Sequence, residues 1–293
     1  MKIIAKIVLL GLITGCLVQS CTKIEEPYYT IKSVFADTNR RAVILEDYTG
    51  HLCTNCAPAA KMAQGLQELY KGQVFVISVH AGDFAEPDST DPNYGRYLKD
   101  NFICQAGTDW FTYKPFNIDQ NPKGMVNRLP YKTKTSFLPA DWAGAIGASV
   151  ALPKAAIISI SNNYDSVAKI LTANIGMRFL TGLSGNINLC VCVLEDSIYG
   201  GQLNSKPGDS TPIIKKFRFM DVLRGSLNGS WGELIATNPA TNFSMSKPFK
   251  INFNDQPKWV ARHCNIVAFI MDADTKEVYH VAKMAVVKTK KTP

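Results

Sequence analysis

The most chemically distinctive feature of the sequence is a pair of cysteines separated by two residues. Cys53 and Cys56 follow the apolar run 42–45 and precede a segment with apolar residues at helical spacing. They are therefore predicted to lie in a loop where a strand gives way to a helix. A helix N-terminus presents unpaired N–H groups and the positive end of the helix dipole, and both stabilise a thiolate. Cys53 is expected to be the exposed, attacking thiol, and Cys56 the shielded thiol that resolves a mixed disulfide.

Two other uses of this cysteine pair stay open. The pair could be a structural disulfide, although closing so short a loop contributes roughly 2 kcal/mol, against about 4–5 kcal/mol for a loop of about 75 residues. A zinc site is the third interpretation. It needs four ligands, and His51 is the only further candidate near the motif. Redox chemistry is the favoured interpretation, and it requires no metal and no organic cofactor.

The composition describes an ordinary globular protein. The chain has 293 residues, of which 46% are hydrophobic and 19% are charged, and this length predicts two domains. The formal net charge is +8, but the basic residues are dispersed in small clusters. No basic block is interleaved with aromatic residues, so nucleic-acid binding is not predicted.

Residues 1–20 are predicted to be a lipoprotein signal peptide. Lys2 and Lys6 precede the apolar run 7–13, which is too short to span a membrane comfortably. Small residues and a cysteine follow, as in bacterial lipoprotein signals. Cys16 matches the usual cleavage pattern better, but cleavage there would begin the tether with Leu17 and Val18. Cys21 is therefore the predicted lipidation site, and a plain secretory peptide is the alternative.

The next segments predict a tether and then an α/β domain. Residues 21–40 form the tether and a connecting segment, and residues 41–152 form the domain. Its elements are strand 41–48, helix 57–70 and strand 74–80, a spacing that predicts a parallel βαβ unit. Residues 82–120 are a polar insertion with an acidic start and a short helix over 94–102. Its carboxylates could bind calcium, but they lack EF-hand spacing, and a solvated loop is favoured.

Residues 153–293 are predicted to form an all-β domain, an antiparallel immunoglobulin-like sandwich. Seven strands are expected, over 156–161, 168–179, 186–194, 217–223, 243–253, 264–271 and 278–287. Cys190 and Cys192 lie two apart on one strand, so they share a face and cannot easily bridge each other. Cys264 could pair with one of them. Buried free thiols are the favoured state for these three, and the state of Cys104 in the insertion stays open.

The βαβ unit with Cys53-Thr54-Asn55-Cys56 at the helix start resembles thioredoxin-like domains. In that fold a proline with a cis peptide bond faces the cysteine pair, and Asn121-Pro122 matches its placement. More closely, the chain resembles the Bacteroidetes outer-membrane lipoproteins named for an outer membrane protein of twenty-eight kilodaltons. The matching stretches are 20–27, 46–56 and 122–128, together with the order of anchor, thioredoxin-like domain and β-rich domain. Two features depart from these patterns. Thr54-Asn55 replaces the Gly-Pro usual in thioredoxins, and Ala57 stands where many relatives have proline.

The resemblance and the cysteine pair together imply a lipid-anchored thiol–disulfide oxidoreductase of the outer membrane. Its partners would be protein thiols or disulfides. Cys53 would attack, Cys56 would resolve, Pro122 would shape the substrate groove and Asp47 would assist proton transfer or cap a loop. The alternative is a surface-exposed binding or adhesion lipoprotein that recognises a protein or glycan. In that case the thioredoxin-like domain is a scaffold, and Trp231 or Trp259 would contact the ligand.

Overall fold

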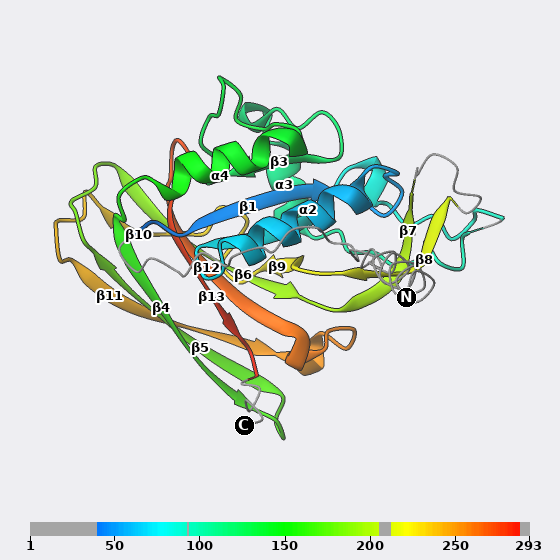
Figure 1. The fold of residues 1–293 in the computed structure, drawn as a ribbon. Helices are drawn as coiled ribbons and strands as arrows, with labels where there is room; N and C mark the ends of the chain where they lie inside the picture. The colour runs from blue at the N-terminus through cyan, green and yellow to red at the C-terminus, as the bar shows by residue number, and fades with distance from the viewer. Residues whose placement is uncertain (1–39, 93, 205–211, 288–293) are drawn as a thin grey trace, which may run out of the picture. The chain divides into compact units, whose positions relative to one another are not determined.

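The computed structural model describes residues 40–92, 94–204 and 212–287. The predicted signal peptide and tether, with Cys16 and Cys21, lie outside the described residues. The apolar run after residue 41 forms strand β1 (Val43–Thr49), followed by helix α2 (Cys56–Leu69) and strand β2 (Val74–His80). Strands β1 and β2 pair in parallel from Val43↔Val74 to Thr49↔His80. The predicted βαβ unit is confirmed (Figure 1).

Strand β3 (Lys123–Val126) extends this sheet on the other side of β1, and the two strands are antiparallel. The Asn121–Pro122 peptide bond that precedes β3 is cis, as the sequence predicts. Helix α4 (Trp142–Val150) follows a 3-10 turn, Pro139–Asp141. Helices α2 and α4 bury one face of the β1–β3 sheet, because Val43, Leu45, Ala63 and Ile146 share one apolar cluster.

The insertion between β2 and β3 differs from the predicted polar loop. It contains two 3-10 turns (Asp83–Ala85 and Lys114–Phe116) and helix α3 (Gln105–Thr112), whose Trp110 is fully buried. The helix predicted over 94–102 is wrong, since only turns occur there. At Gly95 the chain folds back closely on itself, since a Cβ at this position would lie 2.4 Å from the carbonyl oxygen of Ser89.

The C-terminal half is built of strands, as predicted. They are β4 (Ala156–Asp165), β5 (Ile170–Phe179), β6 (Asn186–Glu195), β7 (Ile198–Leu203), β8 (Ile213–Phe219), β9 (Val222–Ser226), β10 (Glu233–Thr237), β11 (Ser244–Asn252), β12 (Cys264–Asp272) and β13 (Val278–Ala285). The strand expected over 217–223 is two strands, because Asp221 adopts a left-handed conformation (φ 54°) that breaks it. Strands β7 and β10 were not predicted. Two adjacent glycines, Gly200 and Gly201, interrupt the alternation of apolar and polar residues by which β7 could have been predicted.

The largest sheet joins the two halves of the chain. Its order is β13-β12-β6-β9-β2-β1-β3, with β10 beside β6. The link is a short parallel bridge between Ser78 of β2 and Val222 of β9, supported by a 2.8 Å hydrogen bond from the Ser78 N–H to the Asp221 carbonyl. The described residues between 40 and 287 belong to one compact unit. The boundary expected at residues 152–153 falls between α4 and β4, where the secondary structure changes to strands, and the division into two domains stays a prediction.

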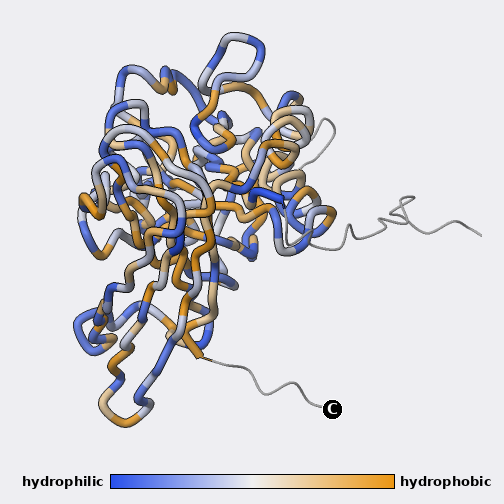
Figure 2. The backbone as a smooth tube through the Cα atoms, turned by 90° about the vertical axis from the view of Figure 1, so that its left-hand side faces the viewer, coloured by the Kyte–Doolittle hydropathy of each residue, from blue (hydrophilic) through white to orange (hydrophobic). Residues whose placement is uncertain are grey.

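Strands β6 and β12 are apolar throughout because both of their faces are buried. On β6, Cys190 and Cys192 face a core shared with Trp110 and β1, whereas Val191 and Val193 face a second core. The second core lies against a three-stranded sheet of order β11-β5-β4. The chain is thus mostly β-strand with several sheets, and the immunoglobulin-like sandwich of residues 153–293 stays a prediction, since the larger sheet also contains β1, β2 and β3. Figure 2 shows hydrophobic and hydrophilic stretches following one another along the backbone, with hydrophilic stretches at many of the outer turns.

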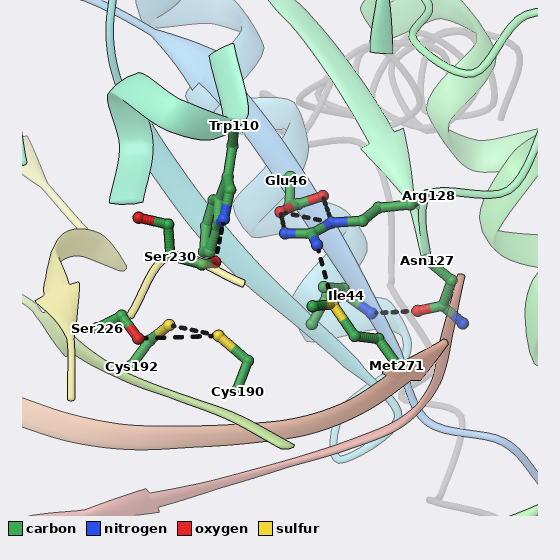
Figure 3. A network of polar contacts seen from close by, with 10 residues as sticks. All are labelled: Ile44, Glu46, Trp110, Asn127, Arg128, Cys190, Cys192, Ser226, Ser230 and Met271. Atoms are coloured by element: carbon green, nitrogen blue, oxygen red, sulfur yellow. Dashed lines mark hydrogen bonds and ion pairs between the residues drawn. The ribbon is translucent and has the colours of Figure 1, made fainter. Parts of the chain in front are cut away.

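A buried ion pair ties these layers together (Figure 3). Arg128 follows β3 and donates to Glu46 of β1, with Nε–Oε2 and Nη2–Oε1 distances of 3.0 and 2.7 Å, and both side chains are fully buried. Its Nη1 also contacts Met271 Sδ of β12 at 3.3 Å. Four aromatic rings surround the guanidinium, at 4.7 to 5.5 Å from their centroids: Trp110, Phe116, Trp231 and Phe269. Burial alone would lower the pKa of Arg128, but the Glu46 carboxylate reverses that effect and raises it.

Removing Arg128 should destabilise the fold strongly. Arg128→Met leaves the Glu46 carboxylate buried without a partner, and such a change costs about 3–5 kcal/mol. Urea unfolding would measure the loss. A double variant, Glu46→Leu/Arg128→Met, removes both charges and should regain much of the stability. The matched control is Lys132→Met, which breaks an exposed ion pair with Asp141. Equal unfolding midpoints for Arg128→Met and this control would contradict the prediction.

Candidate active site: a covered cysteine pair

Cys53 and Cys56 form a disulfide, with their Cα atoms 5.4 Å apart. Cys56 is the first residue of α2, so the predicted placement at a helix start is confirmed. The first turn of α2 contains no acidic residue, and no side-chain hydrogen bond caps it. The positive end of the helix dipole is therefore not neutralised from within the helix. An anion such as a cysteine thiolate is stabilised in that field.

The expectation that Cys53 is the exposed member of the pair is wrong. Cys53 is 4% exposed and Cys56 is 1% exposed. Strand β7 covers them: the Gln202 side-chain amide lies 3.2, 3.3 and 2.9 Å from the carbonyl oxygens of Gly50, His51 and Cys53. The Leu203 N–H also donates to the His51 carbonyl at 2.8 Å. This cover comes from a strand about 150 residues away, so local sequence reasoning could not reveal it.

Asp47 lies on β1, six residues before Cys53. Because strand residues alternate between faces, it shares the face of Val43 and Leu45, which α2 and α4 cover. Its side chain is fully buried, and neither carboxylate oxygen has a hydrogen-bond partner among the described residues. Desolvation by burial raises the pKa of Asp47 to about 7. At neutral pH this carboxyl group can therefore accept or release a proton. The alternative role in capping a loop has no support, since capping would need a hydrogen bond.

Pro122 is buried and directly precedes β3. Lys123, the first residue of β3, pairs with Tyr48 near the end of β1 from which the chain continues to Cys53. The cis proline and the cysteine loop therefore lie at the same end of the sheet. Contact between Pro122 and the sulfur atoms stays a prediction.

Two buried histidines near the cysteine loop were not predicted as a pair. His80 ends β2 and packs against the rings of Phe102 and Phe219, with centroids 5.0 and 5.5 Å away. Neither of its ring nitrogens has a hydrogen-bond partner among the described residues. Burial, with a smaller contribution from His51, lowers the pKa of His80 to about 3. Burial also lowers the pKa of His51, whose Nε2 lies 3.1 Å from the Glu86 carbonyl oxygen.

The zinc interpretation gains no support from the geometry. Within the part of the chain that the structure describes, no group of three His, Cys, Asp or Glu side chains is arranged to hold a metal ion. The acidic start of the insertion likewise forms no such group.

The other described cysteines are free. Cys190 and Cys192 lie on one face of β6 with their sulfur atoms 3.7 Å apart and form no disulfide, as predicted. Cys264 faces the opposite core and pairs with neither. Cys104 is partly buried, and burial raises the pKa of both Cys104 and Cys264. Thiols in such surroundings stay protonated near neutral pH.

The fold and this site define a β-rich protein in which a strand–helix–strand unit carries a Cys-x-x-Cys disulfide. Residues 111–290 match the family described as Outer membrane protein Omp28, and the chain belongs to this family. The chain is similar to the solved structure of HBP35 of Porphyromonas gingivalis, with 16% identity and a TM-score of 0.59 over 87% of this chain and 78% of that one. The two proteins thus share a fold.

A second solved structure is a domain of the outer membrane lipoprotein Omp28 from Porphyromonas gingivalis. It is 21% identical, with a TM-score of 0.30 over 45% of this chain and 88% of that one. No curated protein matches the chain. Within the described residues, no helix is both long and apolar enough to cross a membrane.

The ionisation of Asp47 should make stability depend on pH. Between pH 3.8, the ordinary pKa, and about 7, the folded state holds a proton that the unfolded state has lost. Stability should therefore fall as the pH rises through this window. Asp47→Asn cannot ionise, so at pH 8.5 it should unfold with a free energy about 2–4 kcal/mol higher than the unchanged protein.

Urea unfolding at pH 4.5 and 8.5 would measure this effect. At pH 4.5 most of the advantage of Asp47→Asn should disappear, because Asp47 is then protonated. The exposed Asp255→Asn provides a matched control at both pH values. A stability difference for Asp47→Asn that is the same at pH 4.5 and 8.5 would show that Asp47 stays ionised in the folded protein.

Proposed function

We propose that this protein is a lipid-anchored, thioredoxin-like thiol–disulfide oxidoreductase of the cell envelope. The observation that carries the proposal is a disulfide at the start of α2. It is accompanied by Asp47 on the helix-covered face of the neighbouring sheet, an unpartnered carboxyl group with a pKa near neutrality. A purely structural disulfide needs neither the helix N-terminus nor a titrating carboxyl group. Both are typical of a reactive dithiol.

The proposed reaction balances without a cofactor. A substrate thiolate attacks Cys53 Sγ, which forms a mixed disulfide and breaks the bond to Cys56. Cys56 leaves as a thiolate and takes a proton from the carboxyl group of Asp47. A second substrate thiolate then attacks the substrate sulfur and releases the Cys53 thiolate. Two substrate thiols become one disulfide, and the two electrons reduce the protein pair to a dithiol.

The reverse direction uses the same groups. The Cys53 thiolate attacks a substrate disulfide, Asp47 accepts the proton of Cys56, and Cys56 resolves the mixed disulfide. Pro122 shapes the loop on the neighbouring strand, where its missing N–H leaves that position without a backbone donor. Because both cysteines are nearly inaccessible, attack by a protein substrate requires the hydrogen bonds of Gln202 to open locally.

The anchor is proposed to be a lipid on Cys21, at the start of the tether. Acyl chains contribute about 0.8 kcal/mol per buried CH₂, so two or more hold a protein stably at a membrane. The family's description as an outer membrane protein supports this location. The folded residues would then be displayed from the membrane on the tether of residues 21–40.

The second candidate function is a binding lipoprotein with a vestigial cysteine pair, and the burial of the pair favours it. The two tryptophans predicted as ligand contacts give it little support. Trp231 is half-buried against Tyr113 and Phe116, and Trp259 is half-buried against Phe253 and Arg224. A direct test of thiol exchange separates the two functions.

Thiol exchange should depend on both cysteines in different ways. With the full chain in detergent and a disulfide-bonded test protein, Cys56→Ser should accumulate a mixed disulfide at Cys53, visible by non-reducing gel and mass spectrometry. Cys53→Ser should form none, and both changes should lower turnover at least about a hundredfold because neither can complete the cycle. Cys104→Ser is the matched control and should keep full activity. Absence of turnover in the unchanged protein would favour the binding function.

Acylation should be found at Cys21. Mass spectrometry of the mature N-terminus should show a lipid-modified residue 21, and Cys21→Ser should release the protein from membranes. Acylated Cys16 would refute the site, and an unmodified N-terminus would refute the anchor.

A further inference from the structure

A groove runs beside the cysteine pair, between α2 and the β7–β8 hairpin. Its volume is about 430 Å³, within the range of ligand-binding clefts. Ala57 and Pro58, which directly follow Cys56, line one wall, and Ile214 and Phe217 of β8 line the other. The β7–β8 pairing shifts register between Gln202↔Ile214 and Gly200↔Phe217. Such a bulge lets both apolar side chains point to one side.

Among the residues that the structure describes, the charged side chains lining the groove are positive. Lys61 of α2 and Arg218 of β8 line it, and both are exposed. The described residues that line the groove include no acidic residue, and neither does the first turn of α2. Arg218 donates to a neutral partner, the Ser197 hydroxyl, at 2.8 and 3.2 Å. Its positive charge is therefore not neutralised by this contact.

The neighbouring cations strengthen this field. Lys215 and Lys216 are exposed on β8, and Lys215 lies 5.6 Å from the ring of Tyr97, another neutral group. The first turn of α2 lines the groove through Ala57 and Pro58, so the positive end of the helix dipole lies beside it. A groove with apolar walls and positive charges is complementary to an extended segment that carries both apolar and acidic side chains.

The groove is also coupled to the cysteine loop. Gln202 of β7, whose amide contacts the Cys53 carbonyl oxygen at 2.9 Å, pairs with Ile214 in the groove wall. The groove begins one residue after Cys56. A chain seated in it thus lies against β8, the strand that pairs with β7, and β7 covers the disulfide.

We propose that this groove binds an acidic, extended segment of the partner protein that exchanges disulfides with Cys53 and Cys56. The substrate class is then a cysteine-containing protein with acidic residues near its reactive sulfur. This inference rests on the proposed function for the identity of the substrate, but binding itself requires no redox step. Two positive side chains that line the groove should favour an acidic over a basic segment by about tenfold or more at low salt, and screening should reduce the preference at high salt.

Binding can be measured without exchange. The full chain with Cys53→Ser/Cys56→Ser is titrated into two fluorescein-labelled twelve-residue peptides, one of Glu, Leu and Gly and one with Lys in place of Glu. Fluorescence anisotropy at about 20 and 200 mM salt should show at least tenfold tighter binding of the acidic peptide, weakening as salt rises. Lys61→Glu/Arg218→Glu should remove that preference.

The matched control is Lys71→Glu/Lys258→Glu, which reverses two exposed lysines outside the groove. It should leave the affinity for the acidic peptide within about twofold, and urea midpoints of both variants verify folding. Equal binding of the two peptides would overturn the proposal. So would equal weakening by the groove and control variants.

A parallel assay separates this proposal from the proposed function. The unchanged protein is mixed with 2-mercaptoethanol, a small thiol without charged groups other than its sulfur, and with the acidic peptide carrying one cysteine. Faster reaction of the peptide, lost in Lys61→Glu/Arg218→Glu while the 2-mercaptoethanol rate changes much less, supports the groove as the substrate site. Equal loss of both rates overturns it. If neither thiol reacts, the oxidoreductase function fails, and the anisotropy result alone decides whether the groove binds acidic segments.

Discussion

The buried pair of Glu46 and Arg128 is the constraint on which the arrangement of the layers depends. Two full charges are removed from water, so each must find its partner and the surrounding rings must close over both. Glu46 belongs to β1, Arg128 follows β3, and the aromatic wall comes from the insertion and from β12. The charges are satisfied only when all these segments meet. The pair therefore makes the N-terminal and C-terminal halves interdependent.

Much of the framework of the site could be predicted from sequence because it is local. The strand–helix–strand unit follows from two continuous apolar runs and a helical pattern between them, and its bounds agree closely with the structure. The cis bond at Pro122 depends on one residue type at one turn. The two-residue period of a strand likewise predicts that Cys190 and Cys192 share a face and form no disulfide with each other.

The features that escaped prediction are set by contacts between distant parts of the chain. Burial of Cys53 depends on Gln202, and the division of one expected strand depends on Asp221. The β9–β2 bridge pairs residues 78 and 222, and neither strand carries a sequence signal for the other. The apolar pattern of β6 predicts burial on both faces, but it does not say which two cores the faces meet.

The bridge between β2 and β9 also bears on the order in which the molecule can assemble during synthesis. One edge of β2 is closed only by a strand that leaves the ribosome more than 140 residues later. Until then that edge presents backbone groups able to pair with another chain. Contacts so distant in sequence form slowly, since a long loop must close first. During synthesis, the β2 edge of the N-terminal half therefore stays unpaired until β9 of the C-terminal half has been made.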